Sequence, residues 1–455
     1  MDTDFIGRLK QAVLGSTEQP LVFLGNFEVE ELWAVDELGL PRVSAGGGAA
    51  VVNSMDELAL LLGGKGDHVV LKHAPDPAYR AYLEELGLDL PQVHVPATAD
   101  PGNNVTQDAV ADHELVAKLA GLAGSGAHLL AHGVSTVEEL LSDLTGLPLA
   151  APGAALCKAV NSKVYSRRVS DELGIRQPRG WACDNLDQLA QAVIEAAAVL
   201  DEGRHVVVKE AFGVSGKGIS VVKDARRLDR LFRMIENSAA RAHVERIAFV
   251  IEEWVTKLTD LNYQFTVSRD GSVRFDFVKE AITENGVHKG HRMPARLDAQ
   301  QFEIIRTTAL KVGARLAADG FYGVVGVDAL VEPDGGIFPV LEINARNNMS
   351  TYQVRLQEAF VADGELAMAR HYPLRLAEPI GFPRLREALG DLLFDGHGSG
   401  LLVNNFATVN AGAAVAGGNP FAGRLYGVVI AGDAEELTRV DDEITHRLAV
   451  LEKGE

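Results

Sequence analysis

Residues 321–346, FYGVVGVDALVEPDGGIFPVLEINAR, contain two apolar runs separated by a short polar segment. The runs 321–331 and 337–344 predict two strands, because both are rich in β-branched and aromatic residues. Residues 332–336 carry proline, aspartate and two glycines, which favour a turn. The stretch therefore predicts a β-hairpin, and the rest of the chain is interpreted outward from it.

Polar side chains interrupt the two apolar strands at regular intervals. Glu342, Asn344 and Arg346 are spaced by two, so they share one face if the extended conformation persists. Asp328 joins that face only if it lies opposite an even-numbered residue of the second strand. In such a register the residue numbers of each opposed pair sum to an even value. This condition requires an odd-length loop or a bulge, and the Gly335-Gly336 pair permits either.

Two carboxylates and an amide oxygen on one sheet face form an oxygen-only cluster of the kind that suits Mg²⁺ shared with phosphates. Arg346 beside them would clamp a transferring phosphoryl group or an oxyanion. The alternative is a solvated polar face. The strongly apolar neighbours of Asp328, Glu342 and Asn344 favour the metal interpretation.

A second glycine-rich segment follows the strand predicted for residues 205–210. Another strand begins at Ile219, so the segment is a strand–turn–strand hairpin and matches a P-loop neither in spacing nor in context. Its glycines leave backbone N–H groups open to a phosphate, although a flexible hairpin with solvated lysines is an equal alternative. The candidate phosphate-binding residues are Lys209, Gly213, Ser215, Gly216, Lys217 and Gly218.

An apolar strand predicted for residues 246–251 ends in two adjacent carboxylates, Glu252 and Glu253. Such a pair is commonly a solvated edge. The alternative is a hinge whose main chain, up to Val255, pairs with a purine edge. Asp260 would then accept from ribose hydroxyls.

The first third of the chain alternates short apolar runs with helical patterns. Residues 21–24, 49–52 and 68–71 predict buried strands, and residues 55–62 and 77–86 predict helices. This alternation predicts a doubly wound α/β domain with a parallel sheet.

Composition restricts the function classes. The chain has 455 residues, 47% of them apolar, with 43 Lys plus Arg against 63 Asp plus Glu and a formal charge of −20. The acidity argues against nucleic acid or an anionic membrane surface as a main partner. No apolar run reaches the ~18 residues of a membrane span. The acidic N-terminus is unlike a signal peptide and two cysteines cannot form a disulfide framework, so a cytoplasmic location is expected.

Taken together, the ordered motifs resemble the ATP-grasp superfamily over roughly residues 155–375. They comprise Asn161-Ser162-Lys163 in a helix predicted for 155–173, the Lys209 strand with its glycine turn, the hinge, and the metal hairpin. The resemblance implies that Lys163 and Lys209 contact ATP phosphates and that the glycine turn closes over them. It also implies adenine pairing at Glu252, Glu253 and Val255, ribose binding at Asp260, Mg²⁺ (or Mn²⁺) binding at Asp328, Glu342 and Asn344, and Arg346 near the γ-phosphate.

The same resemblance implies a three-part chain. Residues 1–152 would form a pre-ATP-grasp domain and residues 153–378 the ATP-grasp domain, with a mobile lid at about 180–255. Residues 379–455 would form a small C-terminal domain similar to that of pheganomycin-type peptide ligases, with strands at 401–410 and 424–431.

The activity implied is ADP-forming ligation, in which a carboxylate becomes an acyl phosphate and is then captured by an amine. Antibiotic or other secondary-metabolite biosynthesis is the expected context, with small-molecule substrates and a possible homodimer. The alternatives are loading of an amino acid onto an acyl-carrier protein through a thiol, and a non-catalytic nucleotide-binding regulator.

A basic cluster, Lys289, His291 and Arg292, is the candidate carboxylate or phosphopantetheine site. An exposed charged loop is the equal alternative. Lys279 is a further catalytic candidate.

Overall fold

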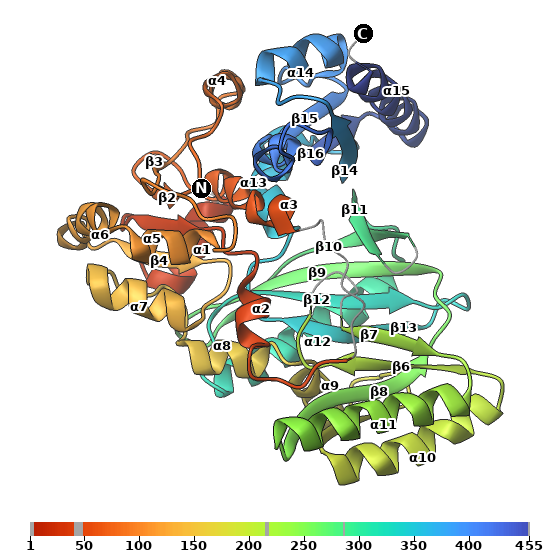
Figure 1. Cartoon of the computed structure of the whole chain (residues 1–455). Helices are drawn as coiled ribbons and strands as arrows, with labels where there is room; N and C mark the ends of the chain where they lie inside the picture. Colours follow the sequence, from red (N-terminus) through yellow and green to blue (C-terminus); the bar gives the residue numbers. More distant parts are fainter. Residues whose placement is uncertain (1–3, 41–48, 214–217, 285–286, 454–455) are drawn as a thin grey trace.

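The structure, a computed structural model, describes residues 4–40, 49–213, 218–284 and 287–453. These residues form a mixed α/β fold with three sheets: a four-stranded N-terminal sheet, a four-stranded middle sheet and an eight-stranded sheet that runs through the molecule (Figure 1). None of the helices in the described ranges is both long and apolar enough to cross a bilayer.

The N-terminal sheet is parallel, as predicted, with strand order β3-β2-β1-β4. Its strands are β1(Leu21–Leu24), β2(His68–Val70), β3(Gln92–His94) and β4(His128–Ala131). The surrounding helices are α1(Phe5–Leu14), α2(Val29–Trp33), α3(Ala49–Asn53), η1(Met55–Leu61), α4(Pro77–Glu85), α5(Val105–Ala111), α6(His113–Ala120), η2(Ala123–Ser125) and α7(Thr136–Thr145).

The strand predicted for residues 49–52 was wrong, because these residues begin the short helix α3. A four-residue apolar run does not distinguish a strand from a buried helical turn by periodicity. The helix predicted for 155–173 is two helices, α8(Ala154–Val160) and α9(Lys163–Glu172). The break follows from Ser162, whose side chain caps the second helix by accepting from the Val164 N–H.

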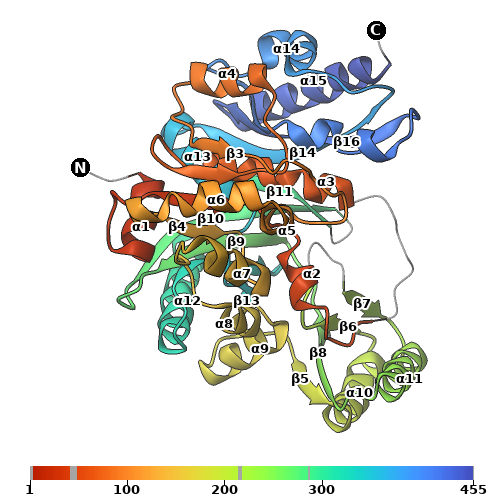
Figure 2. The same ribbon diagram turned by 60° about the vertical axis from the view of Figure 1, so that its left-hand side comes forward.

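The middle sheet is antiparallel in order β5-β8-β6-β7, and α10 and α11 cover one of its faces (Figure 1). Its elements are β5(Gly180–Asn185), α10(Leu186–Asp201), β6(His205–Glu210), β7(Ile219–Val222), α11(Ala225–Ala242) and β8(Arg246–Trp254). This small unit corresponds to the segment predicted as a lid. The α2 helix lies between it and the N-terminal sheet (Figure 2).

The large sheet has the order β13-β12-β9-β10-β11-β14-β16-β15. Its strands are β9(Thr259–Val267), β10(Val273–Glu284), β11(Val287–Met293), β12(Gly323–Val331), β13(Ile337–Asn344), β14(Leu366–Leu376), β15(Gly400–Asn405) and β16(Phe421–Ala431). The remaining helices are α12(Ala299–Ala318), η3(Thr351–Gln353), α13(Val354–Phe360), α14(Phe382–Leu389), η4(Gly390–Leu392), η5(Ala407–Asn410), η6(Ala413–Val415) and α15(Ala434–Glu452).

Residues 379–455 extend the large sheet through β16, which pairs with β14, and β15, which pairs with β16. The predicted boundary at residue 378 therefore does not coincide with a break in the sheet. The strand predicted for 401–410 ends at Asn405, where its last residues turn into the η5 helix. Strand pairing with β16 ends at Asn405, although Thr408 Oγ1 of η5 still donates to the Arg424 carbonyl oxygen of β16, and a propensity pattern does not report where pairing ends.

The predicted hairpin is formed by β12 and β13, and its register satisfies the condition for a shared face. Asp328 lies directly opposite Glu342, with a register shift between Asp328 and Leu330. The five-residue connection and this bulge keep Asp328, Glu342 and Asn344 on one side of the sheet.

Candidate functional site

A row of polar side chains crosses four strands of the large sheet. Glu342 on β13 is opposite Asp328 on β12, which is opposite Asn262 on β9, which is opposite Lys279 on β10. Asn262 Nδ2 donates to Asp328 Oδ1 at 2.9 Å, and Asn344 Nδ2 lies 3.4 Å from Asp328 Oδ2. Directly opposed residues on neighbouring strands have close Cβ atoms, so the row is a single site rather than scattered charges.

The two carboxylates of the row repel one another. Burial and then the charge of Glu342 raise the pKa of Asp328 to about 6. A cation between Asp328 and Glu342 would remove this repulsion, and carboxylate and amide oxygens are the donors that Mg²⁺ takes together with phosphates. The described residues hold no group of three or more His, Cys, Asp or Glu side chains able to bind a metal alone. The donor set of Asp328, Glu342 and Asn344 therefore fits a cation that takes its other ligands from a bound phosphate.

Lys163 joins this row to the beginning of the glycine turn. It is the first residue of α9, and its Nζ lies 2.7 Å from Glu342 Oε1 and donates to the Gly213 carbonyl oxygen at 3.1 Å. Its backbone N–H donates to the Ala211 carbonyl oxygen at 2.9 Å. The side chain is 7% exposed, so its ammonium is fixed beside the carboxylates.

Lys209 lies on β6, directly before the glycine turn, and forms an ion pair with Glu252 on the neighbouring strand β8. Glu253 forms an ion pair with Arg204 at 2.5 Å, and its backbone N–H donates to the Arg179 carbonyl oxygen at 2.7 Å. The hinge residues thus lie against the strand that carries Lys209, while their pairing with adenine stays a prediction.

The two ends of the glycine turn have φ values that favour glycine, +146° at Gly213 and +76° at Gly218. The predicted phosphate contacts at Ser215, Gly216 and Lys217 lie outside the described residues.

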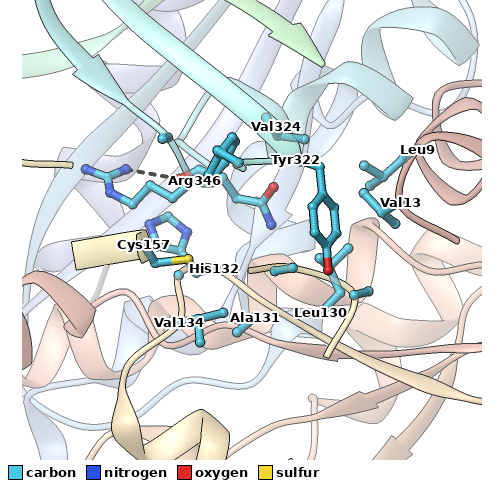
Figure 3. Close-up of a pocket in the computed structure, with 17 residues that line it drawn as sticks. Leu9, Val13, Leu130, Ala131, His132, Val134, Cys157, Tyr322, Val324 and Arg346 are labelled. Carbon is cyan, nitrogen blue, oxygen red and sulfur yellow. Dashed lines mark hydrogen bonds between the residues drawn. The ribbon is translucent and has the colours of Figure 1, made fainter. Parts of the chain in front are cut away.

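Arg346 lies next to the same row. Its Nη2 donates to Asn344 Oδ1 at 3.0 Å, its Nη1 donates to the Asn347 carbonyl oxygen at 3.0 Å, and its guanidinium pairs with Glu30 of α2. Arg346 also borders a small cavity whose other lining includes His132 and, at the far side, Leu9 and Val13 (Figure 3). Arg346 thus lies between the polar row and Glu30 of the N-terminal part of the chain.

The family comparisons agree with this geometry. A model described as pre ATP-grasp domain matches residues 55–147, and a model described as carbamoyl-phosphate synthase L chain, ATP binding domain, matches residues 163–352. The chain carries a pre-ATP-grasp domain followed by an ATP-grasp domain.

Among sequence relatives is the [butirosin acyl-carrier protein]–L-glutamate ligase of Niallia circulans, 26% identical over 215 residues, which are 47% of this chain and 49% of that protein. The formate-dependent phosphoribosylglycinamide formyltransferase of Synechococcus sp. (strain CC9311) is 29% identical over 181 residues, 40% of this chain and 44% of that protein. The match thus spans just under half the length of each of these two relatives.

Solved structures of the same fold include an ADP complex of N5-carboxyaminoimidazole ribonucleotide synthetase, with a TM-score of 0.54, 13% identity and coverage of 94% of this chain and 97% of that one. A biotin carboxylase from Campylobacter jejuni gives a TM-score of 0.54, 13% identity and coverage of 94% and 91%. At this identity the likeness establishes the fold.

The predicted ribose residue of the ATP-grasp domain, Asp260, lies on the same sheet face as the row. It accepts from Thr283 Oγ1 at 2.6 Å and pairs with Lys257. A bound ribose would therefore compete with these two partners, and the assignment stays a prediction.

Lys279, at the other end of the row, is fully buried. Its Nζ donates to the Ser350 carbonyl oxygen at 3.2 Å and lies 4.3 Å from the centre of the Phe277 ring. Burial lowers the pKa of Lys279 to about 7. Lys279 is thus a buried cation within the ATP-grasp sheet whose charged form is disfavoured by burial, and direct contact with a reacting group stays a prediction.

The predicted basic cluster does not form on one face. Alternation along β11 places His291 on the side of the polar row and Arg292 on the opposite side, where Arg292 Nη1 lies 3.8 Å from Glu280 Oε2, while Lys289 lies at a register shift between β10 and β11. Three cations close in sequence were interpreted as one patch, but extended backbone separates neighbouring side chains.

Sequence reasoning missed two residues of the site. Asn262 holds Asp328 in place, and its signal is a polar residue at an inward position of an apolar strand, 259–267. Glu30 is a charged residue on the buried side of α2, next to Val29 and Trp33. A buried carboxylate on a helix flanked by apolar residues is the pattern that would have found it.

Proposed function

We propose that this protein is an ATP-dependent, ADP-forming ligase that activates a carboxylate and joins it to an amine. The observation that carries the proposal is the convergence of the four-strand polar row, Lys163 and Arg346 at the start of the glycine turn. A phosphate-binding turn, a hard cation site and an arginine are what phosphoryl transfer to a carboxylate requires.

Each group of site residues is assigned to one part of the bound nucleotide or to the metal ion. Lys163 and Lys209 would bind the ATP phosphates, with Glu252, Glu253 and Val255 at adenine and Asp260 at the ribose. Asp328, Glu342 and Asn344 would hold Mg²⁺, or Mn²⁺, which supplies charge neutralisation at the phosphates. In this family's chemistry a substrate carboxylate oxygen attacks the γ-phosphorus, and the bond to the ADP oxygen breaks.

The second step forms the product bond. The amine nitrogen attacks the acyl carbon, the carbon–phosphate oxygen bond breaks, and the nitrogen loses a proton as phosphate leaves. Arg346 would neutralise the negative oxygen that develops during this attack. His291, on the sheet face of the polar row, and Lys289 two residues before it are the candidate contacts to the substrate carboxylate.

A second candidate is transfer to a carrier-protein thiol, favoured by the similarity to an acyl-carrier-protein ligase of butirosin biosynthesis. The proposal includes a secondary-metabolite context, a cytoplasmic location and a homodimer.

The test is ADP release with a panel of amino acids, followed by addition of free amines or of an acyl-carrier protein. Amide formation with free amines supports the first candidate, and turnover that requires the carrier supports the second. Glu342→Gln serves as the inactive control. Absence of ATP consumption in every combination would contradict both candidates and leave a nucleotide-binding regulator.

A further inference from the structure

The α2 helix of the pre-ATP-grasp domain packs against the residues that lead into the glycine turn. Val29 and Trp33 belong to one buried apolar cluster with Ala211 and Phe212, and the Trp33 and Phe212 ring centres are 6.3 Å apart. The segment before Gly213 is thus supported by a helix from another part of the chain.

Glu30 projects from this helix between two parts of the ATP-grasp domain. Its Oε2 accepts from the Gly213 N–H at 3.0 Å, and its Oε1 accepts from Arg346 Nε at 3.0 Å and from Arg346 Nη2. The Glu30 side chain is 7% exposed, and that of Arg346 is 9% exposed. One buried carboxylate therefore connects the first residue of the glycine turn to the arginine beside the metal row.

The same contacts leave Gly213 held from both sides, because its carbonyl oxygen accepts from Lys163 Nζ at 3.1 Å. Burial acts to raise the pKa of Glu30, but the charges of Arg346 and Lys163 outweigh it and keep the pKa below its ordinary value. Glu30 is thus ionised at neutral pH. Its negative charge balances two cations that would otherwise repel each other.

We propose that Glu30 is a positioning residue that orients Arg346 toward the γ-phosphate and fixes the start of the glycine turn. The proposal rests on the proposed nucleotide site. It means that a residue of the pre-ATP-grasp domain helps to organise that site. Glu30 Oε1 accepts from both Nε and Nη2 of Arg346. Two contacts to one carboxylate oxygen fix the orientation of the planar guanidinium. Removal of the charge would leave Arg346 oriented by its weaker contacts to Asn344 Oδ1 and the Asn347 carbonyl oxygen.

The test compares Glu30→Gln with a matched control, Glu358→Gln. Glu358 also bridges distant parts of the chain, since it pairs with Arg8 and accepts from the Phe5 N–H at 2.9 Å, and in the described part of the chain these contacts do not involve Gly213 or Gly218. For each variant, calorimetry measures binding of ADP and of β,γ-imido-ATP, ADP release gives kcat and KM, and thermal unfolding gives the melting temperature.

We expect Glu30→Gln to lose about tenfold or more in kcat and in affinity for the ATP analogue, because a charge-assisted contact is lost. Its ADP affinity should change much less, because Arg346 acts at the γ-phosphate. Glu358→Gln should change neither nucleotide affinity. In an Arg346→Gln background, Glu30→Gln should add little, because both changes remove the same contact.

Equal losses for ADP and the ATP analogue would indicate a purely structural role and overturn the proposal. Full additivity with Arg346→Gln would overturn it as well. If the unaltered protein binds neither nucleotide, the proposed function fails together with the Glu30 proposal. If it binds both and Glu30→Gln behaves like Glu358→Gln, only the Glu30 proposal fails.

Discussion

Replacement of Lys279 by methionine tests whether the polar row of the large sheet carries a buried charge. Methionine has nearly the same length as lysine but lacks the ammonium group. Lys279 is completely inaccessible to solvent, and its Nζ touches only the Ser350 carbonyl oxygen, the Gln353 side chain and the Phe277 ring among the contacts described. We expect the substitution to increase the free energy of unfolding at low pH.

The magnitude follows from the pKa. Burial lowers the pKa of Lys279 from 10.5 to about 7. Each pKa unit corresponds to about 1.4 kcal/mol, so the buried ammonium costs roughly 5 kcal/mol. Loss of the hydrogen bond to Ser350 offsets about 1 kcal/mol of this gain. The Ser350 carbonyl oxygen keeps a second donor, the Gln353 N–H at 3.3 Å, and is not left unpaired.

The effect has a defined direction with pH. Above the unfolded pKa of about 10.4 the lysine is neutral in both states, so no charge penalty exists. As the pH falls, the unfolded chain takes up the proton first. The free-energy penalty of the buried ammonium therefore grows as the pH decreases to about 7, and it is complete below that pH. Lys279→Met should therefore exceed the parent in stability by several kcal/mol at about pH 6 and by much less at about pH 10.

Urea unfolding, followed by fluorescence and circular dichroism at both pH values, measures the difference. Lys311→Met, which replaces an exposed lysine of α12, is the control and should show no such pH dependence. Equal destabilisation by Lys279→Met at both pH values would refute the reasoning, because it would mean that the ammonium is compensated in the folded protein.

Further predictions address the phosphate contacts, the metal row and the sheet. Lys209→Met should raise the KM for ATP about tenfold or more in the ADP-release assay, because one charged phosphate contact is lost; an unchanged KM would exclude Lys209 from the phosphate site. Because burial and the neighbouring carboxylate raise the pKa of Asp328 to about 6, Mg²⁺ affinity measured by calorimetry should fall as the pH drops through this value, and a constant affinity would contradict the ligand assignment. Gly290→Ala should destabilise the protein by about 2 kcal/mol or more in urea unfolding, because its Cβ would lie 1.9 Å from the Ala369 carbonyl oxygen. Gly364→Ala, at a φ of +93° with no atom within 4 Å, isolates the backbone strain from that clash and should cost less.

The sequence was sufficient for local features of the site. Alternation along a strand put Glu342 and Asn344 on one face, and the odd-length turn with its glycines allowed Asp328 to join them, as the register confirms. These features depend on residues a few positions apart.

What lay beyond the sequence depends on contacts between distant segments. The row that ends in Lys279 exists only because β9 and β10 take particular places and registers beside β12. Arg292 was grouped with its neighbours although strand geometry turns it to the other face of the sheet.

The amino-acid sequence by itself determined the chemistry available: a metal-binding hairpin, a glycine turn flanked by lysines, and an alternating α/β segment before them. Tertiary structure decided which of these groups meet. The Glu30–Arg346 ion pair joins residues 316 positions apart, and the Lys163–Glu342 pair joins residues 179 positions apart. Local propensity acts over a few residues, whereas the position of a buried charge depends on packing of whole sheets, and only the folded chain specifies that packing.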